Sequence, residues 1–338
     1  VPYVGPVLQK RLLEVFHTPL AVYEANENEL RSVKSLNKRA VKSLLHHRSL
    51  DRAKQILDEA TRTSTNLLTF DSPLYPPHAK DCSASPVVLY YRGPLRSVND
   101  AVVVVGTRRC TDYGKKVAHE LTAQLASCEV PVISGLAKGI DGYVHTACLR
   151  EGGYTVAFVA NGVDVCYPKE HQLLYEEIVK RGTVISQYPP GTKPHPKFFL
   201  QRNALMAAWG THVVVVEAGR KSGSLATADF AKQYGRKLYA VPHRIDAKEG
   251  VGTNKLIEQA AIPYLRFRSL QMIHKKKRVH GNQENHSILG LLQQGPVTVE
   301  QLSKRLQIAE AELTEKLFSL ELEGEIYMRG ETVTLNPK

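Results

Sequence analysis

Residues 101–109 read Ala101-Val-Val-Val-Val-Gly-Thr-Arg-Arg109, an apolar run that ends at a glycine and two arginines. A continuous β-branched run bounded by a turn signal is typical of a strand that is buried on both faces. Similar runs recur, each before a turn or a polar segment, at residues 131–134, 155–160, 183–186, 213–216 and 237–242. Segments of helical length lie between these runs, such as residues 113–128 and 225–234. Strand, turn and helix repeated in this way predict an α/β fold with a doubly wound, mostly parallel sheet.

Ligands of such sheets bind beyond the carboxyl ends of the strands. The sequence places glycines and basic residues at that edge: Gly106, Gly135, Gly139, Gly162, Gly219 and Gly223, with Arg108, Arg109, Lys138, Arg220 and Lys221 beside them. Glycine lets the backbone approach an anion closely, and a helix N-terminus adds partial positive charge. Several such loops on one edge predict an extended anion-binding site.

The stretch from Pro189 to Asn203 is stiffened by prolines and carries Lys193, Lys197 and two adjacent phenylalanines, Phe198 and Phe199. Single-stranded nucleic acid is bound by basic groups along its backbone and by aromatic faces that stack on its bases. This stretch supplies both. The alternative is that both rings anchor the loop to the core. Adjacent side chains usually point in different directions, so one ring can anchor while the other is exposed.

Charge is distributed unevenly. The chain has 338 residues and a formal net charge of +12, which favours a polyanionic partner over a neutral one, although a solvated basic surface is the alternative. Residues 285–338 hold five Lys/Arg and eight Asp/Glu, a balance of −3, so residues 1–284 carry +15. We find no bilayer-spanning apolar run and no signal peptide, and five scattered cysteines without CxxC spacing. We therefore expect a cytoplasmic protein with reduced thiols and no membrane association.

Motifs for cofactor chemistry are missing. The loop Gly106–Gly114 matches neither G-x-G-x-x-G nor a Walker A sequence, so we expect no nucleotide cofactor and no metal. Cys110 is a weak candidate nucleophile because no histidine is placed nearby to activate it. Asp141 is expected to cap a helix, and His145 to be a buried histidine of that helix.

The chain divides into four expected parts: a helical module at 1–70, an extended Rossmann-like domain at 71–265, a basic linker at 266–284 and a winged-helix domain at 285–338. Residues 87–91 are expected to form an extra strand at a sheet edge. The basic face of the helical module is interpreted as solvated, and phosphate binding through helix N-termini and lysines is the alternative. The expected reader helix of the winged helix is acidic, with Glu310 and Glu312 near its start, so we favour protein contact or regulation over DNA reading there.

Residues 101–265 resemble the DNA-processing protein A (DprA, or Smf) family of bacteria. The motifs that carry the resemblance include Val105-Gly-Thr-Arg108, Ser134-Gly-Leu-Ala-Lys-Gly-Ile-Asp141, Tyr167-Pro168, Phe199-x-x-Arg202-Asn203 and Ser222-Gly-Ser-Leu225. The flanking parts look like the family's accessory domains, a SAM- or helix-hairpin-helix-like module and a winged helix. Departures occur where the family usually has Glu, Pro, Arg and Gly; here stand Gln187, Leu200, Ala204 and His243.

The resemblance implies a non-enzymatic protein that binds single-stranded DNA, protects it during natural transformation and helps load the RecA recombinase. It implies a homodimer formed through the Rossmann-like domain. By motif position, Arg108 matches a DNA-contacting arginine and Phe199 a base-stacking ring. The expected DNA-binding residues are Gly106, Arg108, Arg109, Lys138, Gly139, Lys197, Phe199, Arg202, Asn203, Lys221, Ser222 and Gly223.

Two other functions stay open. Similar Rossmann-like folds of the LOG family hydrolyse nucleotide N-glycosidic bonds, and Glu217 or Asp141 could supply the acid–base group. A winged-helix regulator with a metabolite-sensing core is the third possibility, against which the acidic helix argues.

Overall fold

The computed structural model divides into two compact units, residues 1–269 and 270–338. The structure describes residues 1, 3–46, 50–267, 270, 288–292, 295–306, 308–310, 313–314, 317, 320–321, 326–330 and 332–336. Most of the expected linker at 266–284, and much of the expected acidic helix including Glu312, lies outside these residues.

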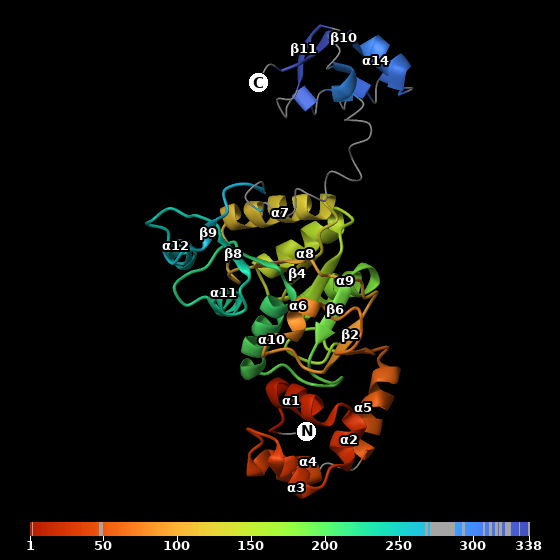
Figure 1. Ribbon diagram of the computed structural model, residues 1–338. Helices are drawn as coiled ribbons and strands as arrows, with labels where there is room; N and C mark the ends of the chain where they lie inside the picture. Colours follow the sequence, from red (N-terminus) through yellow and green to blue (C-terminus); the bar gives the residue numbers. More distant parts are fainter. Residues whose placement is uncertain are drawn as a thin grey trace. The chain divides into compact units, whose positions relative to one another are not determined.

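The first unit begins with short helices, of which the first four pack around a small core of their own (Figure 1). They are α1 (Pro6–Phe16), α2 (Pro19–Glu24), α3 (Glu27–Ser32), α4 (Lys38–His46) and α5 (Asp51–Arg62). The Lys10 ammonium joins this module to the next segment, donating to the carbonyl oxygens of Lys80 at 3.0 Å and Cys82 at 2.8 Å. The helical range ends before residue 70, because residues 66–69 form a strand instead.

A nine-stranded sheet organises the rest of this unit, in the order β1-β2-β6-β5-β4-β3-β7-β8-β9. Its strands are β1 (Asn66–Thr69), β2 (Val88–Arg92), β3 (Val102–Val105), β4 (Val132–Ser134), β5 (Thr155–Phe158), β6 (Thr183–Ser186), β7 (His212–Val215), β8 (Lys237–Ala240) and β9 (Ile262–Pro263). Strands β3 to β9 are parallel, whereas β2 runs antiparallel to β6 and β1 antiparallel to β2. The predicted doubly wound, mostly parallel sheet is confirmed.

The expected edge position of residues 87–91 is wrong. Strand β2 has partners on both sides, because β1 pairs with its outer side. Only one inward-facing residue of β1, Leu68, is buried. A four-residue strand with one buried side chain has no alternation long enough to be recognised in the sequence.

Helices cover both faces of the sheet (Figure 1). These helices are α6 (Pro77–Lys80), α7 (Asp112–Ser127), α8 (Ile140–Arg150), α9 (Gln172–Arg181), α10 (Pro196–Trp209), α11 (Ser224–Gln233) and α12 (Val251–Glu258), with the 3-10 turn η1 (Lys169–His171). Helix α8 packs against α7 and α9 on one face, while α10 packs against α11 and α6 on the other. The alternating side chains of β5 enter two separate cores, Phe158 with Trp209 and Ala157 with Tyr175. None of the described helices is long and apolar enough to cross a bilayer.

Strand β3 lies at the centre of this arrangement. All four of its residues are buried, and it pairs in parallel with β4 on one side and β7 on the other. The chain builds the sheet outward from β3 to β6, then returns through α10 to start again at β7. The loops that follow β3 and β7 therefore diverge to opposite faces, which opens a crevice at their carboxyl ends.

The second unit contains a three-stranded antiparallel sheet in the order β10-β12-β11. Its elements are β10 (Val297–Thr298), α14 (Val299–Leu306), β11 (Ile326–Arg329) and β12 (Thr332–Leu335), and residues 288–292 are helical. Buried apolar residues such as Leu302, Leu313 and Val333 form its core. Helix α14 and the β11–β12 hairpin agree with the predicted winged helix.

Candidate functional site

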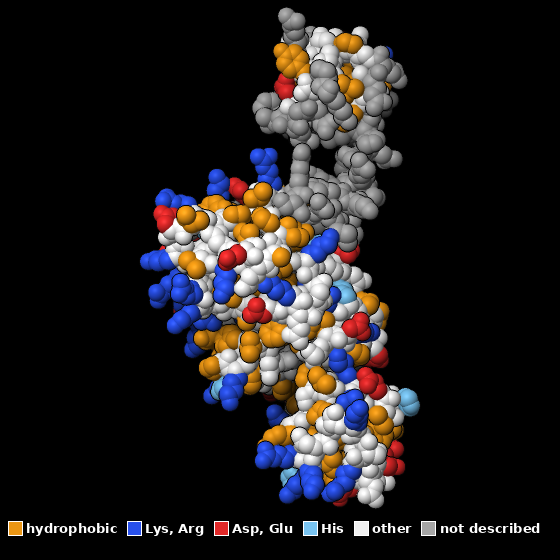
Figure 2. Space-filling model, turned by 60° about the vertical axis from the view of Figure 1, so that its left-hand side comes forward, with side chains coloured by type: hydrophobic (Ala, Val, Ile, Leu, Met, Phe, Trp, Pro, Cys, Tyr) orange, Lys and Arg blue, Asp and Glu red, His pale blue; other side chains and the backbone are white. Residues whose placement is uncertain are grey.

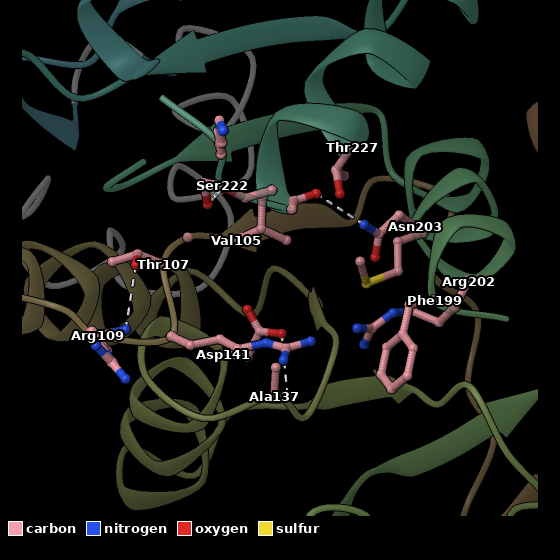
Figure 3. A pocket seen from close by; sticks show the side chains of 16 residues that line it. Val105, Thr107, Arg109, Ala137, Asp141, Phe199, Arg202, Asn203, Ser222 and Thr227 are labelled. Carbon is pink, nitrogen blue, oxygen red and sulfur yellow. Dashed lines mark hydrogen bonds between the residues drawn. The ribbon is translucent and has the colours of Figure 1, made fainter. Parts of the chain in front are cut away.

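A cavity of about 420 Å³ lies at the carboxyl ends of β3 and β7 (Figure 3). Its walls come from the loop after β3, the N-terminal turn of α8, the first half of α10 and the N-terminal turn of α11. Most residues that the sequence singled out meet here: Gly106, Arg108, Arg109, Phe199, Arg202, Asn203, Lys221, Ser222 and Gly223. Elements far apart in the sequence thus build one site.

The loop after β3 is held close to the start of α8. A Cβ at Gly106 would lie 2.5 Å from a side-chain carbon of Ile140, so only glycine fits. Gly139 has a φ of +79°, and a Cβ there would lie 2.3 Å from the Thr107 carbonyl oxygen. Gly139 does not line the cavity. Gly139 instead allows the loop after β3 and the start of α8 to pack closely together. The side chains of Arg108 and Arg109 are exposed at the rim of the cavity.

The two adjacent phenylalanines of α10 have different surroundings. Phe198 stacks on Tyr188, with ring centroids 4.0 Å apart and an interplanar angle of 27°. Phe199 is half-buried and points into the cavity, where the guanidinium carbons of Arg108 and Arg202 each lie 5.7 Å from its ring centroid (Figure 3). Both rings are half-buried, but Phe198 packs on Tyr188 whereas Phe199 lines the cavity.

Arg202 forms part of the cavity floor and is only 6% exposed. Its Nη1 donates to the carbonyl oxygens of Gly135 and, at 2.9 Å, of Phe158. Its Nε is buried without a hydrogen-bond partner among the described residues. The Arg202 side chain therefore ties α10 to β5 and keeps positive charge beneath Phe199.

Asp141 faces Arg202 from the other wall (Figure 3). The expectation that Asp141 caps a helix is wrong: Gly139 is the N-cap residue of α8, and Asp141 lies in the first helical turn. Its carboxylate accepts a hydrogen bond from the Ala137 amide at 3.2 Å. Burial raises the pKa of the Asp141 carboxyl, and the nearby Arg202 charge opposes that rise.

The third wall is the start of α11. The Asn203 amide nitrogen donates to the Gly223 carbonyl oxygen at 3.1 Å, which joins α10 to this turn. The Thr227 hydroxyl lines the cavity, is buried and has no hydrogen-bond partner among the described residues. Met206 was not singled out from the sequence, because it is uncharged and lies one helical turn beyond Asn203, and Thr227 was given no role there.

A smaller cavity of about 80 Å³ adjoins the first and shares Arg108, Ala137, Phe199 and Arg202 with it. Lys138 lies here rather than in the larger cavity, and its ammonium is 2.6 Å from a carboxylate oxygen of Glu170. Tyr167 forms another part of its lining, with its ring centroid 6.0 Å from that of Phe199. Lys197 lines neither cavity and is exposed on the first turn of α10.

The other candidate catalytic groups have structural partners. Glu217 is fully buried, and its carboxylate accepts hydrogen bonds from the Thr111 amide and hydroxyl, with distances from 3.0 to 3.2 Å. Burial raises the pKa of the Cys110 thiol, which disfavours the nucleophilic thiolate. His145 is buried as predicted, bonds to the Thr155 hydroxyl at 2.7 Å, and has a pKa lowered by burial to about 3.

Basic side chains gather on the first unit (Figure 2). Among the ion pairs within the described ranges, none involves Arg108, Arg109 or Lys221, whereas Lys138 is paired with Glu170. The rim of the larger cavity therefore offers positive charge that the described carboxylates do not neutralise.

Comparison with known proteins identifies relatives of both units. The model of the DNA recombination-mediator protein A family matches residues 66–274, and that of the DprA winged helix domain matches residues 278–327. Protein Smf of Synechocystis is 34% identical over 76% of this chain and 66% of its own length. A putative DNA processing protein DprA of Mycobacterium tuberculosis is 40% identical over 63% of this chain and 59% of its own length. The chain thus spans about three fifths to two thirds of these relatives.

Two solved structures share the fold. The X-ray structure of DNA processing protein A from Streptococcus pneumoniae has a TM-score of 0.68 and 29% identity, covering 79% of this chain and 93% of that one. The Helicobacter pylori DNA processing protein A, whose structure concerns its single-stranded DNA binding mode, has a TM-score of 0.56 and 27% identity over 63% of this chain and 96% of that one. With a family model matched across the whole central sheet, this chain belongs to the DprA/Smf family.

Proposed function

We propose that this chain binds single-stranded DNA without sequence preference, through the cavity at the carboxyl ends of β3 and β7. The observation that carries the proposal is the half-buried ring of Phe199, which lines the cavity with the guanidinium groups of Arg108 and Arg202 each 5.7 Å from its centroid. An aromatic face can stack on any unpaired base, and the exposed guanidinium of Arg108 can neutralise a phosphate. The DNA-binding residues proposed from the sequence fit this mode, except that Gly139 acts through loop packing and Lys197 lies outside both cavities.

Duplex DNA fits this cavity poorly. Paired bases present only their edges in the grooves, so Phe199 has no base face on which to stack. A preference for single strands is therefore part of the proposal.

The wider role that we propose is recombination: protection of incoming single strands during natural transformation and help in loading the RecA recombinase, by a homodimer formed through the Rossmann-like domain. The match to a family described as a DNA recombination-mediator protein supports it. The loading role can be tested by RecA-dependent strand exchange on DNA coated with single-strand-binding protein, where the lag before exchange is measured. Added protein should shorten the lag before exchange, and an unchanged lag would contradict the loading role.

We propose binding without catalysis, and the LOG-like hydrolysis of nucleotides is the alternative. Hydrolysis needs a carboxylate free to exchange a proton with the substrate. Glu217 is committed to Thr111, and Asp141 is buried beside Arg202. Both arrangements argue against hydrolysis by these carboxylates. Release of free base from nucleoside monophosphates during prolonged incubation would establish the alternative.

Affinity for a 20-nucleotide oligothymidylate and for a duplex of equal length, measured across a salt series, tests the proposed function. Wild-type protein should prefer the single strand, and Arg108→Ala should weaken binding and flatten the salt dependence, because it removes one phosphate contact. Arg150→Ala is the matched control, since Arg150 is equally charged, exposed and at the opposite end of α8 from the cavity. Equal affinity for single strand and duplex, or equal losses from Arg108→Ala and Arg150→Ala, would contradict the proposal.

A further inference from the structure

The smaller cavity has features of a binding site in its own right. Its lining includes the apolar residues Val159 and Ala160, and its walls include the rings of Tyr167 and Phe199. Arg108, Lys138 and Arg202 add positive charge. Tyr167 was part of a sequence motif but received no role, and its side chain is 44% exposed rather than packed into a core.

Phe199 lines both cavities, together with Arg108 and Arg202. The Tyr167 ring is tilted by 59° against Phe199, with centroids 6.0 Å apart. The two rings therefore do not sandwich a common ligand. They offer separate aromatic faces, one after the other, along a single basic path.

We propose that the smaller cavity is a second nucleotide subsite, in which Tyr167 stacks on the base next to the one held by Phe199, and Lys138 contacts the phosphate. This inference rests on the proposed single-strand binding and extends it from one base to two. A cavity of about 80 Å³ admits part of a base, so the second base rests against the Tyr167 ring with its outer part in solvent.

Recognition at this subsite is independent of base identity. Asn161 is the buried amide in the lining, and its nitrogen already donates to the Gly162 carbonyl oxygen at 2.9 Å and the Val165 carbonyl oxygen at 2.6 Å. Those amide hydrogens are therefore not offered to a base edge. Stacking and phosphate contact remain, which is the pattern of sequence-tolerant single-strand binding.

Tyr167 could instead act only as a support that holds the Phe199 ring in place. Two substitutions separate these roles. Tyr167→Leu keeps apolar volume beside Phe199 but removes the aromatic face, whereas Tyr167→Phe keeps the face. Tyr143→Leu is the matched control, because Tyr143 is 43% exposed and lies outside both cavities.

Affinity for the 20-nucleotide oligothymidylate should fall about tenfold in Tyr167→Leu with little change in salt slope, since stacking is the interaction lost. Tyr167→Phe and Tyr143→Leu should bind within about twofold of wild type by the same reasoning. Wild-type affinity in Tyr167→Leu would overturn the subsite. If Arg108→Ala weakens binding in that same experiment, the proposed function stands while the second subsite falls.

A fluorescence measurement detects stacking directly. The natural tryptophan, Trp209, is fully buried in the core, so its emission should respond little to DNA. The indole introduced by Tyr167→Trp should be quenched when the oligothymidylate binds, and the indole introduced by Tyr143→Trp should not. Equal responses from the two variants under saturating DNA would overturn the inference.

Discussion

The cavity at the carboxyl ends of β3 and β7 and the C-terminal module of the same chain differ in charge and in construction. The cavity gathers arginines from loops that glycines hold together, within a stretch of sequence that carries +15 over residues 1–284. Residues 285–338 carry −3 and fold around their own apolar core. A DNA backbone would be attracted to a positively charged region and repelled by a negatively charged one.

A fold commonly associated with DNA does not by itself decide where a chain binds DNA. Winged helices often read DNA grooves, yet here the acidic module lacks the positive charge needed to hold a phosphate backbone. The α/β domain has that charge, and it adds a half-buried aromatic ring that lines the cavity. We therefore propose DNA binding by the first unit and protein contact by the second.

A large loss of affinity should come from removing two cations, Arg108 and Lys138, together. Arg108→Ala with Lys138→Ala should lower the affinity for single strands roughly fiftyfold at 50 mM salt and reduce the salt slope by about 1.4, at about 0.7 per phosphate contact. Arg108 should account for more of the loss, because Lys138 is already paired with Glu170. Fluorescence anisotropy across a salt series measures both quantities, and an unchanged slope in a folded double variant would refute the placement of DNA in the cavity.

A smaller effect on single-strand affinity, of opposite sign, tests the negative charge that pairs with Lys138. Glu170 is an exposed acidic residue beside the basic cavity, and its pKa is lowered by the hydrogen bond from Lys138. Glu170→Gln should raise the affinity for single strands by about two- to threefold at low salt, because it frees Lys138 for a phosphate. Glu177→Gln on α9 removes an equal charge outside the cavities and serves as the control. Weaker binding by Glu170→Gln would contradict this reasoning.

The smallest effect should come from the acidic region. A chain that ends at residue 284 should bind single strands within about twofold of the full chain, since the missing module contributes net negative charge. Thermal unfolding of the shortened chain should confirm that it remains folded. A loss of tenfold or more in a folded protein would show that the C-terminal module contributes to the DNA site.

Much of the fold was predictable because burial leaves a simple pattern. A parallel strand covered on both faces must be apolar throughout, so residues 102–105 and 213–215 could be recognised without any partner. Strand β1 could not, because only Leu68 of its four residues is buried and its place depends on pairing with β2. Short strands at an edge are specified by tertiary contacts rather than by their own sequence.

Much of the candidate site was also predictable, since glycines and arginines at strand ends follow from the topology. Three features were not. The first is the pairing of Lys138 with Glu170, which lie 32 positions apart. The second is the burial of Arg202, which depends on carbonyl groups of β5 and its neighbouring loop. The third is the difference between Phe198 and Phe199, which depends on Tyr188. Each reflects side-chain packing between segments that sequence spacing does not place.

We propose that the Phe199 ring of the first unit stacks on unpaired bases, and the paired variants Phe199→Ala and Phe198→Ala test this stacking. The measurement is the affinity for the 20-nucleotide oligothymidylate across a salt series, with the thermal midpoint of each variant. Phe199→Ala should bind roughly ten- to a hundredfold more weakly at every salt concentration, with a nearly unchanged slope and thermal midpoint, because stacking is lost and phosphate contacts remain. Phe198→Ala should lower the thermal midpoint, since that ring packs on Tyr188, and should affect binding less. Wild-type binding by a folded Phe199→Ala variant would contradict the stacking mechanism.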